Sequence, residues 1–302
     1  MGAFGLFLLR SSGERSTNRT DEETKPVGPL LVGASFERFM NGDRLMSWHL
    51  RAVLPIGLAL AAVAWGVFAP PVLQDQEYHR FSDTRTLAGV LNAADTLSNL
   101  PFLVVGVLGL AFLQRERSSA ASERFASLQE MPPYWVLFTG VALTSLGSAY
   151  YHLAPDDARL VWDRLPMTIA FMSLVCATVS ERISIPAGSA LLWPLVLLGL
   201  ASVAYWRWST LAGFENLRPY LAVQYGSIAV VLAVSMLYRS RYTHGWAIFV
   251  LAAAYGVAKV LEVCDRQIFE AGQWLSGHTL KHLAAALGVY LLLRALQRRT
   301  LR

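Results

Sequence analysis

The sequence predicts an all-α protein whose helices cross a membrane several times. Of its 302 residues, 54% are hydrophobic and only 16% are charged, whereas soluble proteins carry about 25% charged residues. The mean hydropathy is +0.40, and the apolar residues gather in runs of about 20, the length at which a helix crosses the hydrocarbon layer. Because backbone polar groups in lipid must be satisfied within the protein, these runs predict a polytopic membrane helical bundle.

Eight apolar runs follow one another, and each predicts a transmembrane helix: residues 51–73, 94–114, 134–153, 165–183, 189–206, 219–238, 244–263 and 276–296. The residues before them are largely polar and charged, which predicts a disordered cytoplasmic arm over 1–45; Met46 is an alternative start of the chain. We therefore divide the chain into this arm, an extra transmembrane helix with its outer loop (46–91) and a seven-helix membrane domain (92–302).

Arginine residues alternate between the loops, and this predicts the orientation of the bundle. They gather in every second loop and in the C-terminal tail, at Arg115, Arg117, Arg124, Arg182, Arg239, Arg241, Arg298, Arg299 and Arg302. Since Lys-rich and Arg-rich loops stay on the cytoplasmic side, we expect both termini there and the other loops outside. The net charge of +5 then belongs to an oriented membrane protein, and we expect no nucleic-acid partner. Cys176 and Cys264 both lie in apolar runs and predict no disulfide framework.

Three of the six histidines fall where this topology puts the outer ends of helices. His152 ends the run 134–153, and His278 and His282 open the last run. A spacing of four puts His278 and His282 on one face of a helix, one turn apart. A catalytic zinc ion (Zn²⁺) takes three protein ligands and leaves one position for water, so His152, His278 and His282 are the candidate ligands.

Two further residues are expected at the same depth and turn a metal site into a hydrolytic one. Ser148 precedes His152 by one helical turn, and Asp163 opens the next helix on the same side. A carboxylate beside the metal can hold the activated water and take its proton. Ser148 can hydrogen-bond that water or stabilise an oxyanion on a carbonyl carbon. Both are therefore candidate catalytic residues.

Each of these residues also has a simpler interpretation. A His-x-x-x-His pair is often a coincidence, His152 by itself suits a polar anchor at the interface, and Asp163 can form a loop ion pair with Arg164. Ionisable groups at membrane depth are costly and usually functional, and the convergence of several favours a site.

Polar pairs elsewhere in the helices have open roles. Asp95 suits the positive end of its helix and Asn99 a bond across helices, or both suit support of the metal ligands. Lys259 and Glu262, three residues apart, predict a structural ion pair. Lys281 points about 100° away from His282 and is expected to contact lipid headgroups.

The order and spacing of these motifs resemble the alkaline ceramidase family, within the CREST superfamily of seven-helix membrane hydrolases. The resemblance covers roughly residues 92–296, with the helix 51–73 added in front as in bacterial-type members. It lies in Asp95-Thr96-Leu97-Ser98-Asn99, Ser148-x-x-x-His152, Asp163 and His278-x-x-x-His282. It implies zinc on the three histidines, with Asp163 and Ser148 around the activated water. The implied reaction hydrolyses the amide of ceramide or a related N-acyl lipid, releasing a fatty acid and a sphingoid base.

The resemblance also bears on calcium, location and partners. Eukaryotic members bind Ca²⁺ through an acidic, Trp-containing segment whose last carboxylate would fall near Asn92, an amide in this chain. Asp75, Glu77 and Asp83 are acidic but do not reproduce that segment, so calcium is a weaker expectation than zinc. We expect a multi-pass protein of the bacterial inner membrane, with a lipid substrate and its site near the extracytoplasmic face.

Three other functions compete with the lipid amidase. The first is a seven-helix receptor or sensor of the adiponectin-receptor-like type, with a structural zinc and no turnover. The second is a serine protease with Ser148 as nucleophile, which the metal spacing of the histidines disfavours. The third is a haem-binding cytochrome, which a spacing of four disfavours because both histidines would lie on one face of the haem.

Overall fold

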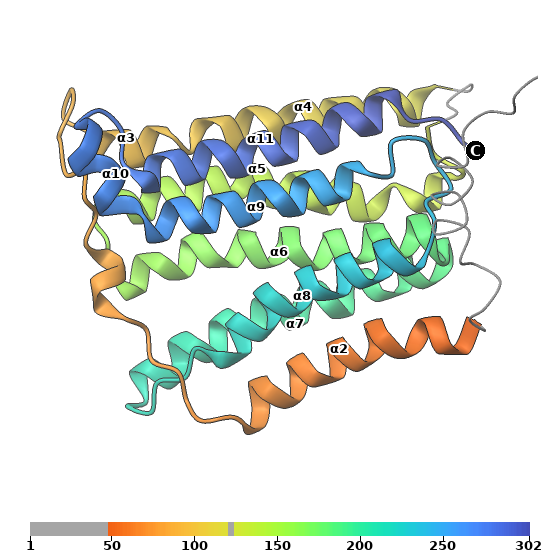
Figure 1. Ribbon diagram of the computed structural model, residues 1–302, viewed down its shortest axis with the longest axis horizontal. Coiled ribbons are helices and arrows are strands. Elements are labelled where there is room, and N and C mark those ends of the chain that lie inside the picture. Colours follow the sequence, from red (N-terminus) through yellow and green to blue (C-terminus); the bar gives the residue numbers. More distant parts are fainter. Residues whose placement is uncertain (1–47, 120–123) are drawn as a thin grey trace, which may run out of the picture. The chain divides into compact units, whose positions relative to one another are not determined.

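The computed structural model describes residues 48–119 and 124–302, and it confirms the all-α fold class. Long helices lie side by side with their ends at two common levels, and no strand occurs in these two ranges (Figure 1). The predicted arm 1–45 lies outside the described residues. We call the end at which α5 finishes and α6 and α11 begin the histidine end.

The elements are α2 (Trp48–Phe68), η2 (Gln76–His79), α3 (Ala93–Leu97), α4 (Leu100–Ser118), η3 (Leu128–Glu130), α5 (Pro132–Leu153), α6 (Asp157–Arg182), α7 (Ile185–Leu211), α8 (Arg218–Leu237), α9 (Ala247–Val263), α10 (Asp265–Gly272) and α11 (Gly277–Arg298). Along the chain α4 packs on α5, α5 on α6 and α6 on α7, while α11 packs on both α9 and α4. The helix α2 contacts mainly α8, whereas α8 and α9 touch each other little.

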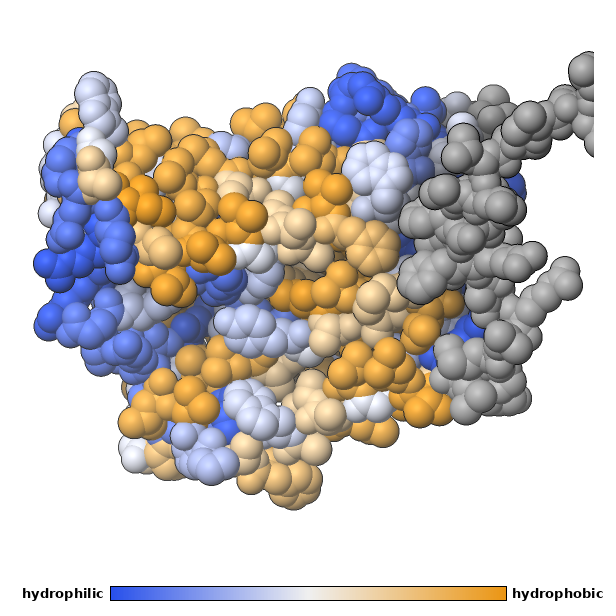
Figure 2. All heavy atoms as spheres, viewed as in Figure 1, coloured by the Kyte–Doolittle hydropathy of each residue, from blue (hydrophilic) through white to orange (hydrophobic). Residues whose placement is uncertain are grey.

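Within residues 48–119 and 124–302, six helices are long and apolar enough to cross a membrane, or seven if α9 and α10, which meet at an angle of 71°, form one broken span. This suits a multi-pass membrane protein. Figure 2 shows hydrophobic residues over the middle of the bundle and hydrophilic residues at the histidine end.

One of the eight runs predicted as spans, the run in α5, is less apolar than the candidate spans just counted, although α5 has 22 residues. The reason is that α5 carries buried polar residues toward the interior: Thr144, Ser145, Ser148 and His152.

Glycines let α5 approach α6 closely beside the histidine end. A Cβ atom on Gly147 would lie 2.0 Å from the backbone oxygen of Trp162, so only glycine fits this crossing. Small residues at helix interfaces allow such backbone contact in membrane bundles. The crossing puts Ser148, which follows Gly147, opposite Asp163, which follows Trp162.

Two of the differences between the predicted runs and the helix boundaries concern the site. The helix α6 begins at Asp157, earlier than the apolar run at 165, because the Asp156 side chain caps it by accepting from the Arg159 amide at 2.7 Å. The run 94–114 is divided into α3 and α4 at Ser98 and Asn99, with a proline in the first turn of α4.

The opposite end of the bundle is held by Arg299, which is 2% exposed. Its guanidinium lies 3.1 Å from the Glu181 carboxylate and 3.8 Å from that of Glu130. The same group stacks on Tyr242, with the ring centroid 3.9 Å away. Burial tends to lower the pKa of Arg299, but the surrounding tyrosines and carboxylates raise it overall. The cluster therefore joins the C-terminal tail to the end of α6 and to the two loops that carry Glu130 and Tyr242, through a charged, buried arginine.

Candidate metal centre

The three predicted ligands come together at the histidine end. His152 lies in the last turn of α5, and His278 and His282 lie in the first two turns of α11. They are 1%, 4% and 6% exposed. One ring nitrogen from each lies within 4.8 Å of the others, and His152 Nε2 is 2.7 Å from His278 Nε2. This buried three-His group could hold a metal ion.

The hydrogen bonds of the rings fit metal ligation. His152 Nδ1 lies 2.6 Å from the Ser148 carbonyl oxygen, which can only accept, so Nδ1 carries the hydrogen. His282 Nδ1 lies 2.8 Å from Ser98 Oγ, and Ser98 donates its own hydrogen to the Asp95 carbonyl. Both rings therefore keep the lone pair on Nε2, as ligating imidazoles do when a second group binds the other nitrogen. The donor set fits zinc, copper, iron or nickel.

Side chains from α3 and α10 fix the start of α11 and hence two of the ligands. Asp95 accepts hydrogen bonds from Ser276 at 3.0 Å and from Thr279 at 2.5 Å. Asp265 accepts from the backbone amide of His278 at 2.7 Å. Of the two roles left open for Asp95, the contacts favour support of the ligands.

The loop before α3 covers the histidines. The Phe81 ring stacks on His152, with centroids 4.8 Å apart, and lies 4.6 Å from His278. The next residue, Ser82, donates its amide to Asp265 at 3.1 Å, which ties the loop to α10. Asn92 donates its side-chain amide to the His152 carbonyl at 2.7 Å. That contact needs an N–H donor, which an amide supplies and an ionised carboxylate does not.

The acidic residues considered for calcium each have a local partner. Asp75 caps η2, Glu77 pairs with Arg80, and Asp83 accepts from Arg85 at 2.7 and 2.8 Å. The hydrogen bonds from Arg85 hold the pKa of Asp83 below its ordinary value.

Ser148 and Asp163 meet beside the metal ligands, as the crossing of α5 and α6 requires. Both are buried, and the Ser148 hydroxyl lies 3.4 Å from His152 Nδ1. Arg164, considered above as an ion-pair partner of Asp163, donates to Gln74 at 2.5 Å and stacks on Trp206 at 4.4 Å.

A cavity of about 360 Å³ opens on this group, and Ser148, Asp163 and His282 all line it. Its wall carries a charged cluster in which Glu262 accepts from Lys259 and from Lys281, each at 2.6 Å. The predicted pair of Lys259 and Glu262 is confirmed, and Lys281, expected at lipid headgroups, is its third member.

A second cavity of about 160 Å³ continues from the first toward the middle of the bundle. The two share Phe102, Thr144 and Met167, and the deeper one is lined almost entirely by apolar side chains. Both cavities reach α8 and α9, which make few contacts with each other. The combined space is polar beside the histidines and apolar further in, a shape that suits an amphiphilic molecule.

Four residues that contact the three histidines had no predicted role at the site: Ser98, Phe81, Asp265 and Asn92. A partial signal existed for Ser98, which belongs to the Asp95–Asn99 motif. In comparisons with known proteins, no family model matches the chain and no curated protein matches it. The candidate function therefore rests on the site itself and on the motif resemblance.

Proposed function

We propose that the protein is an integral membrane, zinc-dependent hydrolase that cleaves the amide of ceramide or a related N-acyl lipid. The observation that carries the proposal is the shared cavity: Ser148, Asp163 and the candidate ligand His282 line one space. That space turns from polar to apolar with depth. The choice of an amide over another acyl bond comes from the resemblance to alkaline ceramidases.

Zinc is the proposed metal because three imidazoles suit it and hydrolysis needs no redox change. Held by His152, His278 and His282, zinc supplies Lewis acidity and lowers the pKa of water toward neutrality. Phe81 and the burial of the rings keep bulk water from the ligands.

Asp163 is the proposed general base and acid. Its carboxylate takes a proton from water as the water oxygen bonds to the amide carbonyl carbon. It then gives the proton to the nitrogen as the C–N bond breaks, leaving a carboxylic acid and an amine. Ser148 lines the same cavity as Asp163, where its hydroxyl would donate a hydrogen bond to the carboxylate and so orient it.

The substrate would enter sideways from the lipid between α8 and α9. Its amide would lie at the polar end, and its acyl chain would occupy the deeper cavity beside Phe171 and Leu251. We assign the histidine end to the extracytoplasmic face of a bacterial inner membrane, because the arginine-rich loops lie at the other end.

The test is release of fatty acid from ceramide by the purified protein, followed in parallel with its zinc content. Asp163→Asn should keep zinc and lose at least about 10²-fold in turnover. Asp157→Asn, in the same helix but outside the cavity, is the matched control and should retain activity. A zinc-loaded wild type that hydrolyses no N-acyl lipid would favour the receptor alternative instead.

A further inference from the structure

The extra helix α2 is attached to the bundle through a narrow strip of small residues. Ala62 and Gly66 of α2 meet Ala222 and Gly226 of α8, and a Cβ on Gly226 would lie 2.7 Å from the Ala62 Cβ. Of the residues Arg51–Phe68 in α2, only 11% are buried. The contact therefore holds α2 close to α8 and leaves its other sides uncovered.

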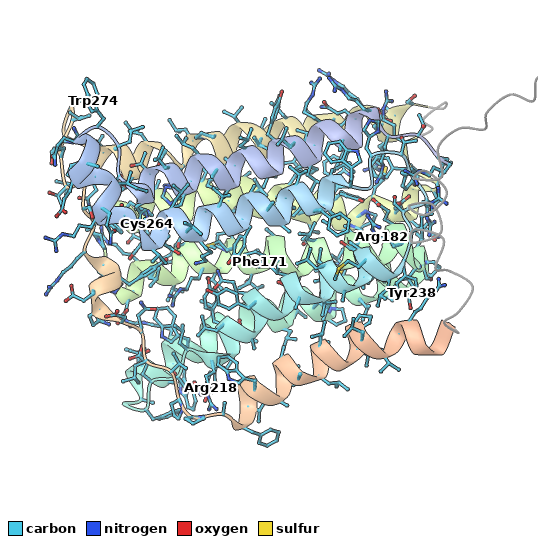
Figure 3. All side chains as sticks on the ribbon, in the orientation of Figure 1. Phe171, Arg182, Arg218, Tyr238, Cys264 and Trp274 are labelled. Atoms are coloured by element: carbon cyan, nitrogen blue, oxygen red, sulfur yellow. The ribbon has the colours of Figure 1, made fainter. Side chains whose placement is uncertain are left out.

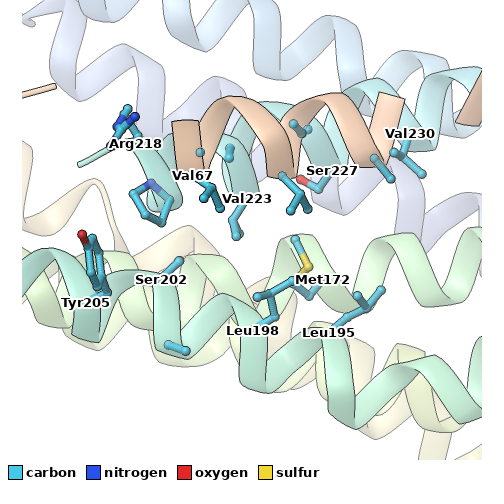
Figure 4. A pocket seen from close by; sticks show the side chains of 18 of the residues that line it. Val67, Met172, Leu195, Leu198, Ser202, Tyr205, Arg218, Val223, Ser227 and Val230 are labelled. Carbon is cyan, nitrogen blue, oxygen red and sulfur yellow. The ribbon is translucent and has the colours of Figure 1, made fainter. Parts of the chain in front are cut away.

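An apolar groove of about 540 Å³ lies beside this strip, between α2, α8 and α7, with Met172 and Val175 of α6 at its floor. In Figure 4, Arg218 and Tyr205 lie at one end of the groove, and Val230 and Leu195 lie at the other. It is separate from the cavity at the histidines, which opens on other faces of α6 and α8.

The groove ends at a buried cation. Arg218 is 7% exposed, and its Nε donates to Asn216 at 2.9 Å. Its Nη1 is buried without a hydrogen-bond partner among the described residues. The neighbouring Glu215 is engaged elsewhere, since its carboxylate accepts from the Trp206 side chain and the Gln74 amide. A buried guanidinium with open donors favours an anionic oxygen ligand.

The length of the groove matches one leaflet of a bilayer. From Arg218 to Val230 along α8 the rise is about 18 Å at 1.5 Å per residue, and half of the hydrocarbon layer is about 15 Å. Arg218 opens α8 at the histidine end (Figure 3), and the ends of membrane-spanning helices are where lipid headgroups are expected. An acyl chain in the groove would therefore start at Arg218 and finish near the middle of the bilayer.

We propose that this groove binds one anionic phospholipid from the leaflet at the histidine end. Its phosphate lies on the Arg218 guanidinium, and one acyl chain fills the space between α2 and α7. The lipid must carry a net negative charge to neutralise Arg218, because this guanidinium has no carboxylate within 4 Å in the described part of the chain. The lipid completes the packing of α2, and this site is independent of the proposed hydrolase activity.

The experiment is a titration of the delipidated full chain, in a neutral detergent, with phosphatidylglycerol and with phosphatidylcholine of the same chains. Native mass spectrometry counts the lipids bound to each chain. We expect one phosphatidylglycerol at concentrations at which phosphatidylcholine does not bind. Arg218→Gln should weaken phosphatidylglycerol binding about ten- to hundredfold, the loss of a charge-assisted hydrogen bond. Arg207→Gln makes the same charge change in α7 outside the groove and should bind as the wild type does.

A second variant tests the groove without touching the charge. Ala201 is exposed on α7 and lines the groove, so Ala201→Phe should block the acyl chain and abolish the bound lipid while the fold, followed by Tm, is kept. Equal binding of the two phospholipids, or unchanged binding in both Arg218→Gln and Ala201→Phe, would overturn the proposal. Preference for a free fatty acid over phosphatidylglycerol would overturn it as well.

Discussion

Replacing Ser98 by alanine removes the oxygen that orients His282 without touching a metal ligand. The Ser98 hydroxyl lies 2.8 Å from His282 Nδ1, and Ser98 as a whole residue is only 7% exposed. Loss of such a partner usually weakens metal binding by 10- to 100-fold, which corresponds to about 1.4–2.8 kcal/mol. Zinc affinity, measured by competition with a chelating dye, should fall within that range in Ser98→Ala.

The matched control is Ser173→Ala. Ser173 is also buried, and it donates within α6 to the Ile169 carbonyl at 2.5 Å, away from the histidines. It should bind zinc as the wild type does. If Ser98→Ala and Ser173→Ala have the same zinc affinity as the wild type, then the hydrogen bond to His282 does not support metal binding and the assignment of its tautomer is wrong.

Three further predictions concern the cover of the site and the stability of the two ends. Phe81→Ala should cost about 3 kcal/mol of packing and speed the removal of zinc by a chelator; equal removal rates would contradict the covering role of the ring. Arg299→Met should cost about 3–5 kcal/mol, because it leaves the buried Glu130 carboxylate without its cation; a Tm equal to that of the wild type would contradict this. Arg85 lowers the pKa of Asp83 in the folded protein. The ionised Asp83 therefore stabilises the fold at any pH above its pKa in the unfolded chain, which is about 3.9. That contribution is lost as pH falls through the folded value, so the acid-side fall in Tm should be shallower in Asp83→Asn; identical profiles would rule the contribution out.

The fold class and the gathering of the three histidines could be predicted because both follow from local patterns. Runs of about 20 apolar residues predict helices in lipid whatever their neighbours are. His278 and His282 share a face through spacing alone, and the alternation of loops puts His152 at the same end. Ser148 and Asp163 were expected nearby for the same reason, and the crossing at Gly147 brings them into contact.

The contacts that depend on a break or on a loop could not be predicted. Ser98 reaches His282 because α3 ends at Leu97 and α4 begins at Leu100, whereas the hydropathy pattern predicted one continuous helix. Phe81 belongs to a loop with no periodic pattern, so its stacking on His152 and its contact with His278 had no signal. For Lys281, helical geometry predicted the angle from His282 but not the partner. The partner is the carboxylate of Glu262, which belongs to another helix.

The most direct test is the metal content of the purified protein, measured with its hydrolysis of ceramide in the same sample. The wild type should hold one zinc ion per chain and release fatty acid, and His278→Ala should lose both. A His278→Ala protein that binds no zinc yet hydrolyses ceramide at the wild-type rate would contradict the account, as would a wild type that is active without any metal.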